Sequence, residues 1–320
     1  TAGRTGRPCM VRIPHMRNWS PEDPFLYDVH IKMGNDSVES YFAMRKIEVK
    51  NDKNGIPRSF LNNKPYFQKG VLDQGYWPDG LYTAPSDEAL IYDIQTMKNL
   101  GFNMIRKHVK VETARWYYHC DRLGMIVWQD MVNGGTYNAP FMTWLPALFP
   151  KFKLHTSDRI HPLFGRKNVH GREEFIRECK ETVTALKAFP CISTWVIFNE
   201  GWGQFDSKKL TALFRELDDT RLIDSASGWF DRRQGDFKSE HNYFAKQFVT
   251  PSDRAFVISE YGGYTCQVKG HTCSGKTYGY KICSSQEEFQ AAYHKLMSEE
   301  IDPLKEQGLC GAVYTQLSDI

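Results

Sequence analysis

The chain has 320 residues, of which 41% are hydrophobic and 25% charged, and its net charge is +3. This length can bury a sizeable core and suits one large domain with a smaller piece. The near balance of 41 basic and 38 acidic residues gives no electrostatic footprint for nucleic acid or an anionic membrane surface. No apolar run approaches the ~20 residues of a membrane helix. We therefore expect neither a nucleic acid nor a membrane as a partner.

The first 50 residues predict paired strands rather than a complete domain. Apolar positions alternate over Tyr27–Met33 and over 38–49, and a Gly-Asn-Asp turn separates the two runs. Two or three strands cannot form a stable sandwich alone. We therefore expect residues 1–50 to be the last strands of an incomplete β-sandwich domain. A polar connection over 51–64 follows, in which two consecutive asparagines indicate a hairpin turn.

From residue 65 to residue 320, short apolar strands alternate with amphipathic helices, which is typical of a parallel α/β domain. About eight strands are predicted, the number that closes a barrel: 67–73, 103–108, 125–131, 193–200, 222–227, 240–244, 256–261 and 311–317. Helices are expected at 87–100, 114–123, 172–188, 207–217 and 286–307. An open doubly wound sheet is the alternative, and it is disfavoured because no Gly-rich phosphate loop follows any strand. We predict a barrel whose eighth strand is cut by the end of the chain.

Aromatic and cysteine residues bear on the kind of site. The 16 Tyr, 20 Phe and 8 Trp fill cores, but such rings also stack on sugars, so they favour a carbohydrate site. The 8 cysteines are scattered. Cys266, Cys273 and Cys283 share one loop-like stretch, but their spacing matches no common zinc pattern, so we expect free thiols. Without a signal-like N-terminus, we expect a bacterial-type cytoplasmic location.

Two of the predicted strands end in a carboxylate. The apolar run from Ser193 leads into Asn199 and Glu200, and the run from Ala255 leads into Glu260, with glycines following each. Barrel enzymes keep their chemistry at the C-terminal ends of the strands. Two such carboxylates suit glycoside cleavage, in which one protonates the leaving oxygen and the other attacks the anomeric carbon. An ion pair or a solvated strand end is the alternative for each side chain.

These segments resemble a known family. Trp195-Val-Ile-Phe-Asn-Glu-Gly-Trp-Gly203 and Ile258-Ser-Glu-Tyr-Gly262 look like the acid/base and nucleophile signatures of family 2 glycoside hydrolases, the β-galactosidase, β-glucuronidase and β-mannosidase group. The resemblance extends to Gly101-Phe-Asn-Met-Ile-Arg-Lys-His108, Asp121-Arg-Leu-Gly-Met-Ile-Val-Trp-Gln-Asp130 and Trp19-Ser-Pro-Glu-Asp-Pro-Phe-Leu-Tyr27. It implies a fragment of a longer enzyme: a (β/α)8 TIM barrel preceded by the last strands of an immunoglobulin-like β-sandwich.

The resemblance also implies roles for single residues. Glu200 matches the acid/base, Glu260 the nucleophile and Asn199 the side chain that binds the sugar 2-hydroxyl. Tyr243 resembles the tyrosine that orients the nucleophile, with a core tyrosine as the alternative. Arg106 is expected to support Glu260 and keep it ionised, because a nearby cation lowers a carboxylate pKa. Further substrate-binding candidates, for which a packing or supporting role is the alternative, are His108, Asp130, His241, Trp202 and Trp229.

Two features depart from the family's pattern. The eighth strand offers Tyr314 and Thr315 where many members have a Trp, which puts the floor of the sugar site in doubt. The Asn-x-Lys feature of glucuronidases is not evident after Glu260, although Lys269 lies in the following loop. Glucuronide specificity is therefore disfavoured.

Together, these observations predict a retaining exo-β-glycosidase that hydrolyses a terminal β-linked sugar, a β-galactoside by preference, from a glycoside or oligosaccharide. No organic cofactor and no metal site is expected. One alternative is a non-catalytic carbohydrate-binding fragment of such an enzyme. The other is a metal-dependent barrel hydrolase that uses Asp130, His108 and His241. The oligomeric state of the full-length protein stays open.

Overall fold

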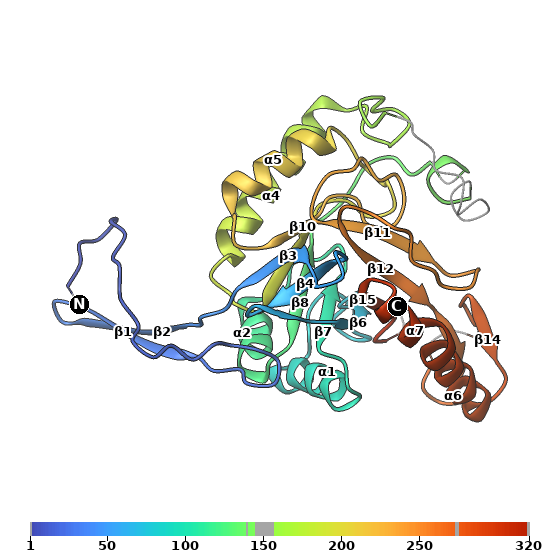
Figure 1. The fold of residues 1–320 in the computed structure, drawn as a ribbon, viewed down its shortest axis with the longest axis horizontal. Helices are drawn as coiled ribbons and strands as arrows, with labels where there is room; N and C mark the ends of the chain where they lie inside the picture. Colours follow the sequence, from blue (N-terminus) through green and yellow to red (C-terminus); the bar gives the residue numbers. More distant parts are fainter. Residues whose placement is uncertain (1, 139, 145–156, 273–274, 319–320) are drawn as a thin grey trace.

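The computed structural model describes the chain except for residues 1, 139, 145–156, 273–274 and 319–320. Its largest sheet has eight parallel strands in the order β10-β9-β8-β7-β6-β15-β12-β11 (Figure 1). The last strand, β15 (Leu309–Thr315), pairs both with β6 (Gln68–Asp73) and with β12 (Ala255–Gly262). The two outer strands of this order contact each other without a continuous ladder. The sheet is thus a nearly closed barrel, and the predicted (β/α)8 fold is confirmed.

The remaining barrel strands are β7 (Met104–Lys107), β8 (Ile126–Asp130), β9 (Ile192–Val196), β10 (Leu222–Asp224) and β11 (Phe237–Asn242). Almost every residue of these strands is buried, because the barrel interior covers one face and helices or loops cover the other. All eight strands fall on segments that the sequence predicts. β11 begins earlier than expected, and β9 ends before Glu200, which therefore lies in the turn that follows the strand.

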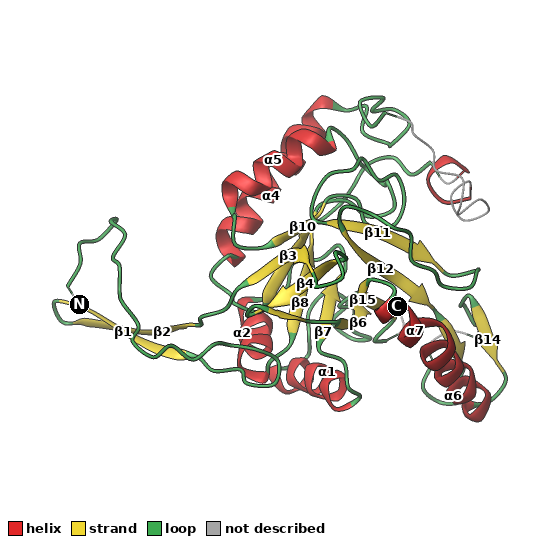
Figure 2. Cartoon of the chain, viewed as in Figure 1, coloured by secondary structure: helices red, strands yellow, loops and turns green. Residues whose placement is uncertain are grey.

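Helices lie outside the strands (Figure 2): α1 (Asp87–Asn99), α2 (Ala114–Leu123), α4 (Val169–Leu186), α5 (Ser207–Leu217), α6 (Gln286–Lys295) and α7 (Asp302–Glu306). A short π-helix, η1 (Pro140–Trp144), lies in the long connection after β8. None of the helices in the described part of the chain combines the length and apolar character needed to cross a membrane.

The helix expected over 286–307 is divided. A π-helical segment, η2 (Leu296–Ile301), separates α6 from α7. Pro303 lies at the start of α7. Proline lacks an N–H and its ring crowds the carbonyl four residues earlier, so the regular α-helical hydrogen bonding cannot run through it.

The barrel interior is filled by side chains. The buried indole of Trp128 donates from Nε1 to Gln68 Oε1 at 2.6 Å and stacks on Phe237 at 5.2 Å. Arg106 is the register partner of Trp128 on the neighbouring strand. The packed layer around Trp128 therefore supports the polar groups at the strand ends.

The residues before the barrel form two small sheets. β1 (Tyr27–Met33) and β2 (Asp36–Phe42) make an antiparallel hairpin that extends away from the barrel (Figure 1). These strands are consistent with an immunoglobulin-like domain before the barrel.

β3 (Ile47–Asn51), β4 (Pro57–Leu61) and β5 (Lys64–Pro65) form a second antiparallel sheet that contacts β10, β12 and β15. The segment 51–64, expected as a connection, thus contains sheet. The many polar residues of its turns hide the buried end of β4 in the sequence.

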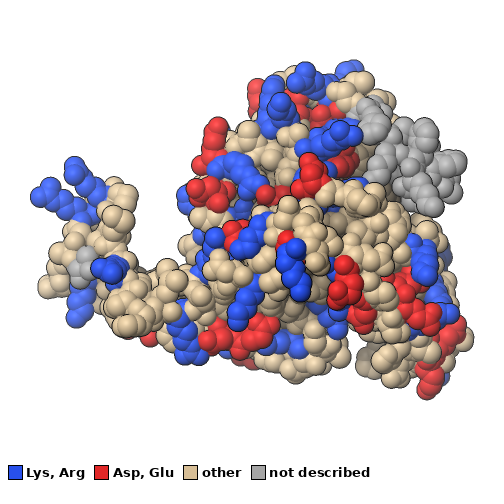
Figure 3. Space-filling model, viewed as in Figure 1, with Lys and Arg blue, Asp and Glu red and all other residues tan. Residues whose placement is uncertain are grey.

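Acidic and basic side chains are interspersed over the face of the barrel seen in Figure 3. This view agrees with the near balance of charges in the sequence.

Candidate active site

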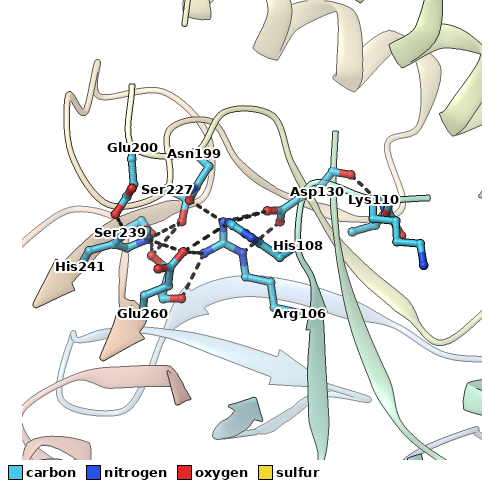
Figure 4. A network of polar contacts seen from close by, with 12 residues as sticks. Arg106, His108, Lys110, Asp130, Asn199, Glu200, Ser227, Ser239, His241 and Glu260 are labelled. Carbon is cyan, nitrogen blue, oxygen red and sulfur yellow. Dashed lines mark hydrogen bonds and ion pairs between the residues drawn. The ribbon is translucent and has the colours of Figure 1, made fainter. Parts of the chain in front are cut away.

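Polar side chains from five of the strands meet at the C-terminal rim of the barrel (Figure 4). They come from the ends of β7, β8, β11 and β12 and from the turn after β9, and they include Arg106, Asp130, Asn199, Glu200, His241 and Glu260. In parallel barrels this rim is where catalytic residues gather.

Arg106 lies at the centre of this network. Its side chain is 0% exposed, and each of its five N–H groups has an acceptor. Nε and Nη2 donate to the two oxygens of Asp130 at 3.0 and 2.9 Å, and Nη2 also donates to Asn199 Oδ1 at 2.8 Å. Nη1 donates to the Ser259 carbonyl at 3.1 Å and to Glu260 Oε1 at 3.2 Å. Arg106 therefore connects the ends of β8 and β12 with the turn after β9.

The charge of Arg106 is secured by its neighbours. Burial opposes the charged form, but the negative charges of Asp130 and Glu260 outweigh this effect and raise the pKa of Arg106. Asp130 is itself buried, and both of its oxygens are taken by the guanidinium. Asp130 thus holds Arg106 in place through both of its oxygens.

Glu260 is almost fully buried at the end of β12. In addition to the Arg106 contact, its Oε2 accepts a hydrogen bond from the Tyr243 hydroxyl, which lies 2.9 Å from Thr315 Oγ1. Burial raises the pKa of Glu260, and its neighbours His241 and Arg106 offset part of that rise. Two donors thus hold one oxygen each and fix the orientation of the carboxylate.

Glu200 lies in a strained turn. Its φ angle is 52°, in the left-handed region that non-glycine residues rarely adopt, and Gly201 follows with a φ of 70°. A Cβ on Gly201 would lie 2.4 Å from the ring of Phe230, so only glycine fits there. Burial raises the pKa of Glu200 to about 7, against the opposing charge of Arg106. At neutral pH a substantial fraction of Glu200 therefore carries a proton.

His241 lies between the two glutamates. Its Nδ1 is 3.0 Å from Glu200 Oε1, and its Nε2 is 3.5 Å from Glu260 Oε1 and 3.0 Å from Ser227 Oγ. Burial lowers the pKa of His241 to about 4, although the charge of Glu260 opposes that change. Gly228 makes room for the ring, because a Cβ there would lie 2.6 Å from it. The imidazole is thus neutral near pH 7.

The carboxyl groups of Glu200 and Glu260 lie close together on either side of His241. One oxygen of Glu200, one nitrogen of His241 and one oxygen of Glu260 all lie within 4.8 Å of one another. In the described part of the chain, no other set of His, Cys, Asp and Glu side chains has metal-ligand spacing. Arg106 already places a cation on Glu260, so a further metal ion fits this set poorly. The alternative set of Asp130, His108 and His241 is not among the groups with such spacing.

The other predicted residues are at the rim as well. His108 bonds through Nδ1 to Gln74 Oε1 at 2.8 Å, and its Nε2 lies 3.7 Å from Glu260 Oε1. Trp202 and Trp229 are half-buried, and both pack on a small apolar cluster that contains Phe164 and Phe230. The Trp229 ring is 5.8 Å from the His241 ring. The structure thus brings every predicted site residue to one rim, with the two tryptophans at its edge.

Several residues of the network are not predicted from the sequence. Ser227 and Ser239 both donate to Ser259 Oγ, at 2.9 and 2.5 Å, and Ser227 Oγ joins this serine cluster to His241 Nε2 at 3.0 Å. Asp224, at the end of β10, is 1% exposed. A polar residue at the end of the apolar strand 222–224 is the one signal that points to Asp224. The serines carry no such signal, because serine is common in strand ends and turns.

Two carboxyl groups a few ångströms apart at the rim of a parallel barrel are typical of enzymes that cleave glycosidic bonds. Residues 57–313 match the family model described as glycosyl hydrolases family 2, TIM barrel domain. The chain belongs to this family.

Relatives support this assignment. A β-galactosidase of Oenococcus oeni is 32% identical over 173 residues, which are 48% of this chain and 16% of that protein. A β-galactosidase of Leuconostoc mesenteroides is 30% identical over 225 residues, which are 67% of this chain and 18% of that protein. The chain therefore spans less than a fifth of the length of either relative.

The fold is also found in a crystal structure of a β-galacturonidase from Eisenbergiella tayi bound to galacturonate. It matches with a TM-score of 0.68 and 18% identity over 96% of this chain and 53% of that one. At 18% identity, this similarity shows that the two proteins share a fold.

The buried carboxyl group of Asp224 yields a prediction about stability. Burial raises its pKa from 3.8 to about 7, although the charge of Arg106 opposes this. The folded protein thus holds this proton more tightly than the unfolded chain, and the stabilisation is lost as pH rises from about 4 through 7. Between about pH 5 and pH 9 the unmodified protein should lose unfolding free energy. In Asp224→Asn that loss should be smaller by on the order of 2–4 kcal/mol.

Urea denaturation at the two pH values measures this difference. Glu200 contributes with the same sign, so part of the pH dependence should remain in Asp224→Asn. The exposed substitution Asp219→Asn is the matched control and should leave the dependence unchanged. An equal fall in Asp224→Asn and in the unmodified protein would show that Asp224 does not titrate as described.

Proposed function

We propose that the chain carries the catalytic barrel of a retaining exo-β-glycosidase that removes a terminal β-linked sugar, a β-galactoside by preference. Residues 65–320 form the barrel in this proposal, and residues 1–50 are the end of the preceding sandwich. The observation that carries it is the closeness of Glu200 and Glu260, which have oxygens within 4.8 Å of each other. Retaining enzymes separate their carboxyl groups by ~5–5.5 Å, whereas an inverting enzyme needs ~6.5–9.5 Å to admit a water molecule.

In the first step, Glu200 donates its proton to the oxygen of the leaving group while an oxygen of Glu260 attacks the anomeric carbon. The glycosidic bond breaks, the leaving group departs as an alcohol, and the sugar is bonded to Glu260. In the second step, the now ionised Glu200 takes a proton from a water molecule that attacks the same carbon. The sugar leaves with its original configuration, and both carboxyl groups return to their starting states.

The neighbours of the two glutamates support these steps. Arg106 and Tyr243 hold the two oxygens of Glu260 and stabilise its charge before attack. Arg106 also holds the Asn199 oxygen, so the Asn199 amide NH2 is the group that can donate to the sugar 2-hydroxyl. The amide thereby orients the 2-hydroxyl, whose own proton becomes more acidic and so a better donor as the transition state develops positive charge.

His241, His108 and the tryptophans bind the sugar and its leaving group in this proposal. The neutral His241, held by Ser227, keeps the Glu200 carboxyl group in place. His108, oriented by Gln74, is placed to contact a sugar hydroxyl next to Glu260. Trp202 and Trp229 offer half-exposed indole faces on the Glu200 side, where the leaving group lies.

The preference for galactose draws on the relatives. The two β-galactosidases share 30–32% identity with the regions of this chain that they match. The β-galacturonidase is more distant in sequence, although it covers more of the chain. Galactose and galacturonate differ at one carbon atom, so the choice between them depends on few contacts.

Substitution of each glutamate distinguishes their roles. Glu260→Ala should abolish turnover of every substrate, and azide should restore reaction with inverted configuration at the anomeric carbon. Glu200→Ala should still form the intermediate from aryl glycosides with acidic phenol leaving groups, but should hydrolyse it about 10²–10⁴-fold more slowly. Azide should then give a glycosyl azide of retained configuration. The measurements are steady-state rates and NMR of the azide products.

The matched control is Glu173→Ala, which removes an exposed carboxylate on α4 and should leave the activity unchanged. Identical behaviour of the two active-site variants, with neither rescued by azide, would contradict the assigned roles. Activity near that of the unmodified protein in both would contradict the enzyme class.

The pKa of Glu200 sets the alkaline side of the pH profile. The acid must be protonated in the free enzyme, so kcat/KM should fall as pH rises above about 7. The fall should be weak for aryl glycosides with strongly acidic phenols, since these need little protonation. Asp224→Asn, which removes the other carboxyl group with a pKa of about 7, should keep the same profile. A plateau extending to about pH 9 with an alkyl glycoside would rule out Glu200 as the acid.

A further inference from the structure

Two cysteines lie opposite each other in the long connection that follows β12. Cys266 ends β13 (Tyr264–Cys266), Cys283 ends β14 (Lys281–Cys283), and the two are register partners in this parallel pair of strands. Aligned residues of neighbouring strands project to the same face of a sheet, and such strands lie ~4.7–4.9 Å apart. A disulfide requires Cα atoms ~4.4–6.8 Å apart. The register thus brings the two thiols within bonding reach.

Neighbouring elements hold both cysteines in place. β13 follows directly after Gly263, whose N–H donates to the Thr315 carbonyl of β15 at 3.0 Å. Cys283 comes just before α6, where the Ser285 hydroxyl caps the helix by accepting from the Glu288 N–H at 3.2 Å. α6 packs against both strands and lies beside β14 in Figure 1. The backbone on either side therefore needs little movement to join the two sulfur atoms.

The two thiols differ in their access to solvent. Both are free, Cys266 is partly exposed and Cys283 is 4% exposed. Burial and the charge of Glu288 raise the pKa of Cys283, Lys281 opposes this rise, and Cys266 adds to it. Cys266 is thus the thiol that a dissolved oxidant meets first. The barrel core holds four further described cysteines, each at most 3% exposed, and so keeps them from such an oxidant: Cys120, Cys179, Cys191 and Cys310.

The loop between the two cysteines reaches the catalytic rim through Tyr280. The Tyr280 ring stacks on the ring of Tyr243, with centroids 3.9 Å apart and planes inclined by 14°. The Tyr280 N–H donates to the Gly263 carbonyl at 2.9 Å, and the Tyr243 hydroxyl donates to Glu260. The loop therefore covers the tyrosine that holds one oxygen of Glu260.

We propose that Cys266 and Cys283 form a reversible disulfide in the presence of oxidised glutathione, and that this bond clamps the loop between them onto the catalytic rim. Two paired strands of three residues each are a weak fastening by themselves, and a covalent link reduces the conformational freedom of the opened loop. The inference concerns a covalent modification and does not depend on the proposed function.

The reaction is a thiol–disulfide exchange in two steps. The thiolate of Cys266 attacks one sulfur of oxidised glutathione, whose disulfide bond breaks, and one glutathione leaves as a thiolate. The thiolate of Cys283 then attacks the Cys266 sulfur of this mixed disulfide and releases the second glutathione. The two protein thiols are oxidised by two electrons, and oxidised glutathione is reduced to two thiols, which take up the two protons.

The test treats the complete protein with buffers of fixed oxidised-to-reduced glutathione ratio, blocks the remaining thiols and maps tryptic peptides by mass spectrometry. Trypsin cuts after lysine and arginine, so it places the three cysteines of this stretch in separate peptides, 255–269, 270–276 and 282–295. We expect 255–269 linked to 282–295 in oxidising buffer, and separate peptides after return to reduced glutathione. Absence of this link, or a link of either peptide to 270–276, would overturn the inference.

Hydrogen exchange tests the clamp. Because the cross-link makes opening of the loop rarer, the backbone N–H of Tyr280 should exchange at least tenfold more slowly in the oxidised protein than in the reduced protein. Cys266→Ser should show neither the link nor the slower exchange, while the slow exchange of its barrel strands shows that it is folded. The matched control is Cys9→Ser, which removes an exposed thiol outside the loop and should behave like the unmodified protein. Equal exchange of Tyr280 in both redox states of the linked protein would show that the bond does not clamp the loop.

Discussion

The site depends on one buried cation. Arg106 is removed from water, and a guanidinium there is tolerated only if charges and acceptors around it compensate for the lost hydration. Its five hydrogen bonds reach Asp130, Asn199, Glu260 and the carbonyl of the residue before Glu260. Because these acceptors belong to three different strand ends, the position of one side chain fixes the relative positions of the others. Loss of Arg106 would leave Asp130 and Glu260 as uncompensated charges in a buried layer.

The two glutamates occupy the same rim and differ in their surroundings. Glu260 receives donors on both oxygens, one of them from Arg106, which favours its charged form. Glu200 has no cation in contact, and burial raises its pKa to about 7. His241 joins them without adding charge, since its own pKa is lowered to about 4. Pairs of carboxyl groups whose environments differ in this way divide into a proton donor and a charged partner.

The sequence predicts the barrel and its main polar residues because both follow local rules. An apolar strand buried on two faces ends where polar residues begin, so Glu200 and Glu260 are visible as the first carboxylates after their strands. Ser227 follows β10 and Ser259 lies on β12, so they meet only through the arrangement of strands around the barrel, which no local pattern records. Tyr280 lies in a long connection, and its stacking on Tyr243 depends on the pairing of β13 (Tyr264–Cys266) with β14 (Lys281–Cys283) and on Gly263. The hairpin turn at Asn62 and Asn63 is predicted, but the strand β4 before it is not, because polar turns interrupt its short apolar run.

The central claim is that Glu260 attacks the sugar directly across a gap too narrow for an intervening water molecule. The configuration of the first-formed product tests this claim, because direct attack requires two displacements at the anomeric carbon and a single displacement by water requires one. Proton NMR of the complete protein acting on an aryl β-galactoside resolves the two anomers before they equilibrate. The account predicts that the β-anomer of the free sugar appears first. Initial release of the α-anomer would contradict it.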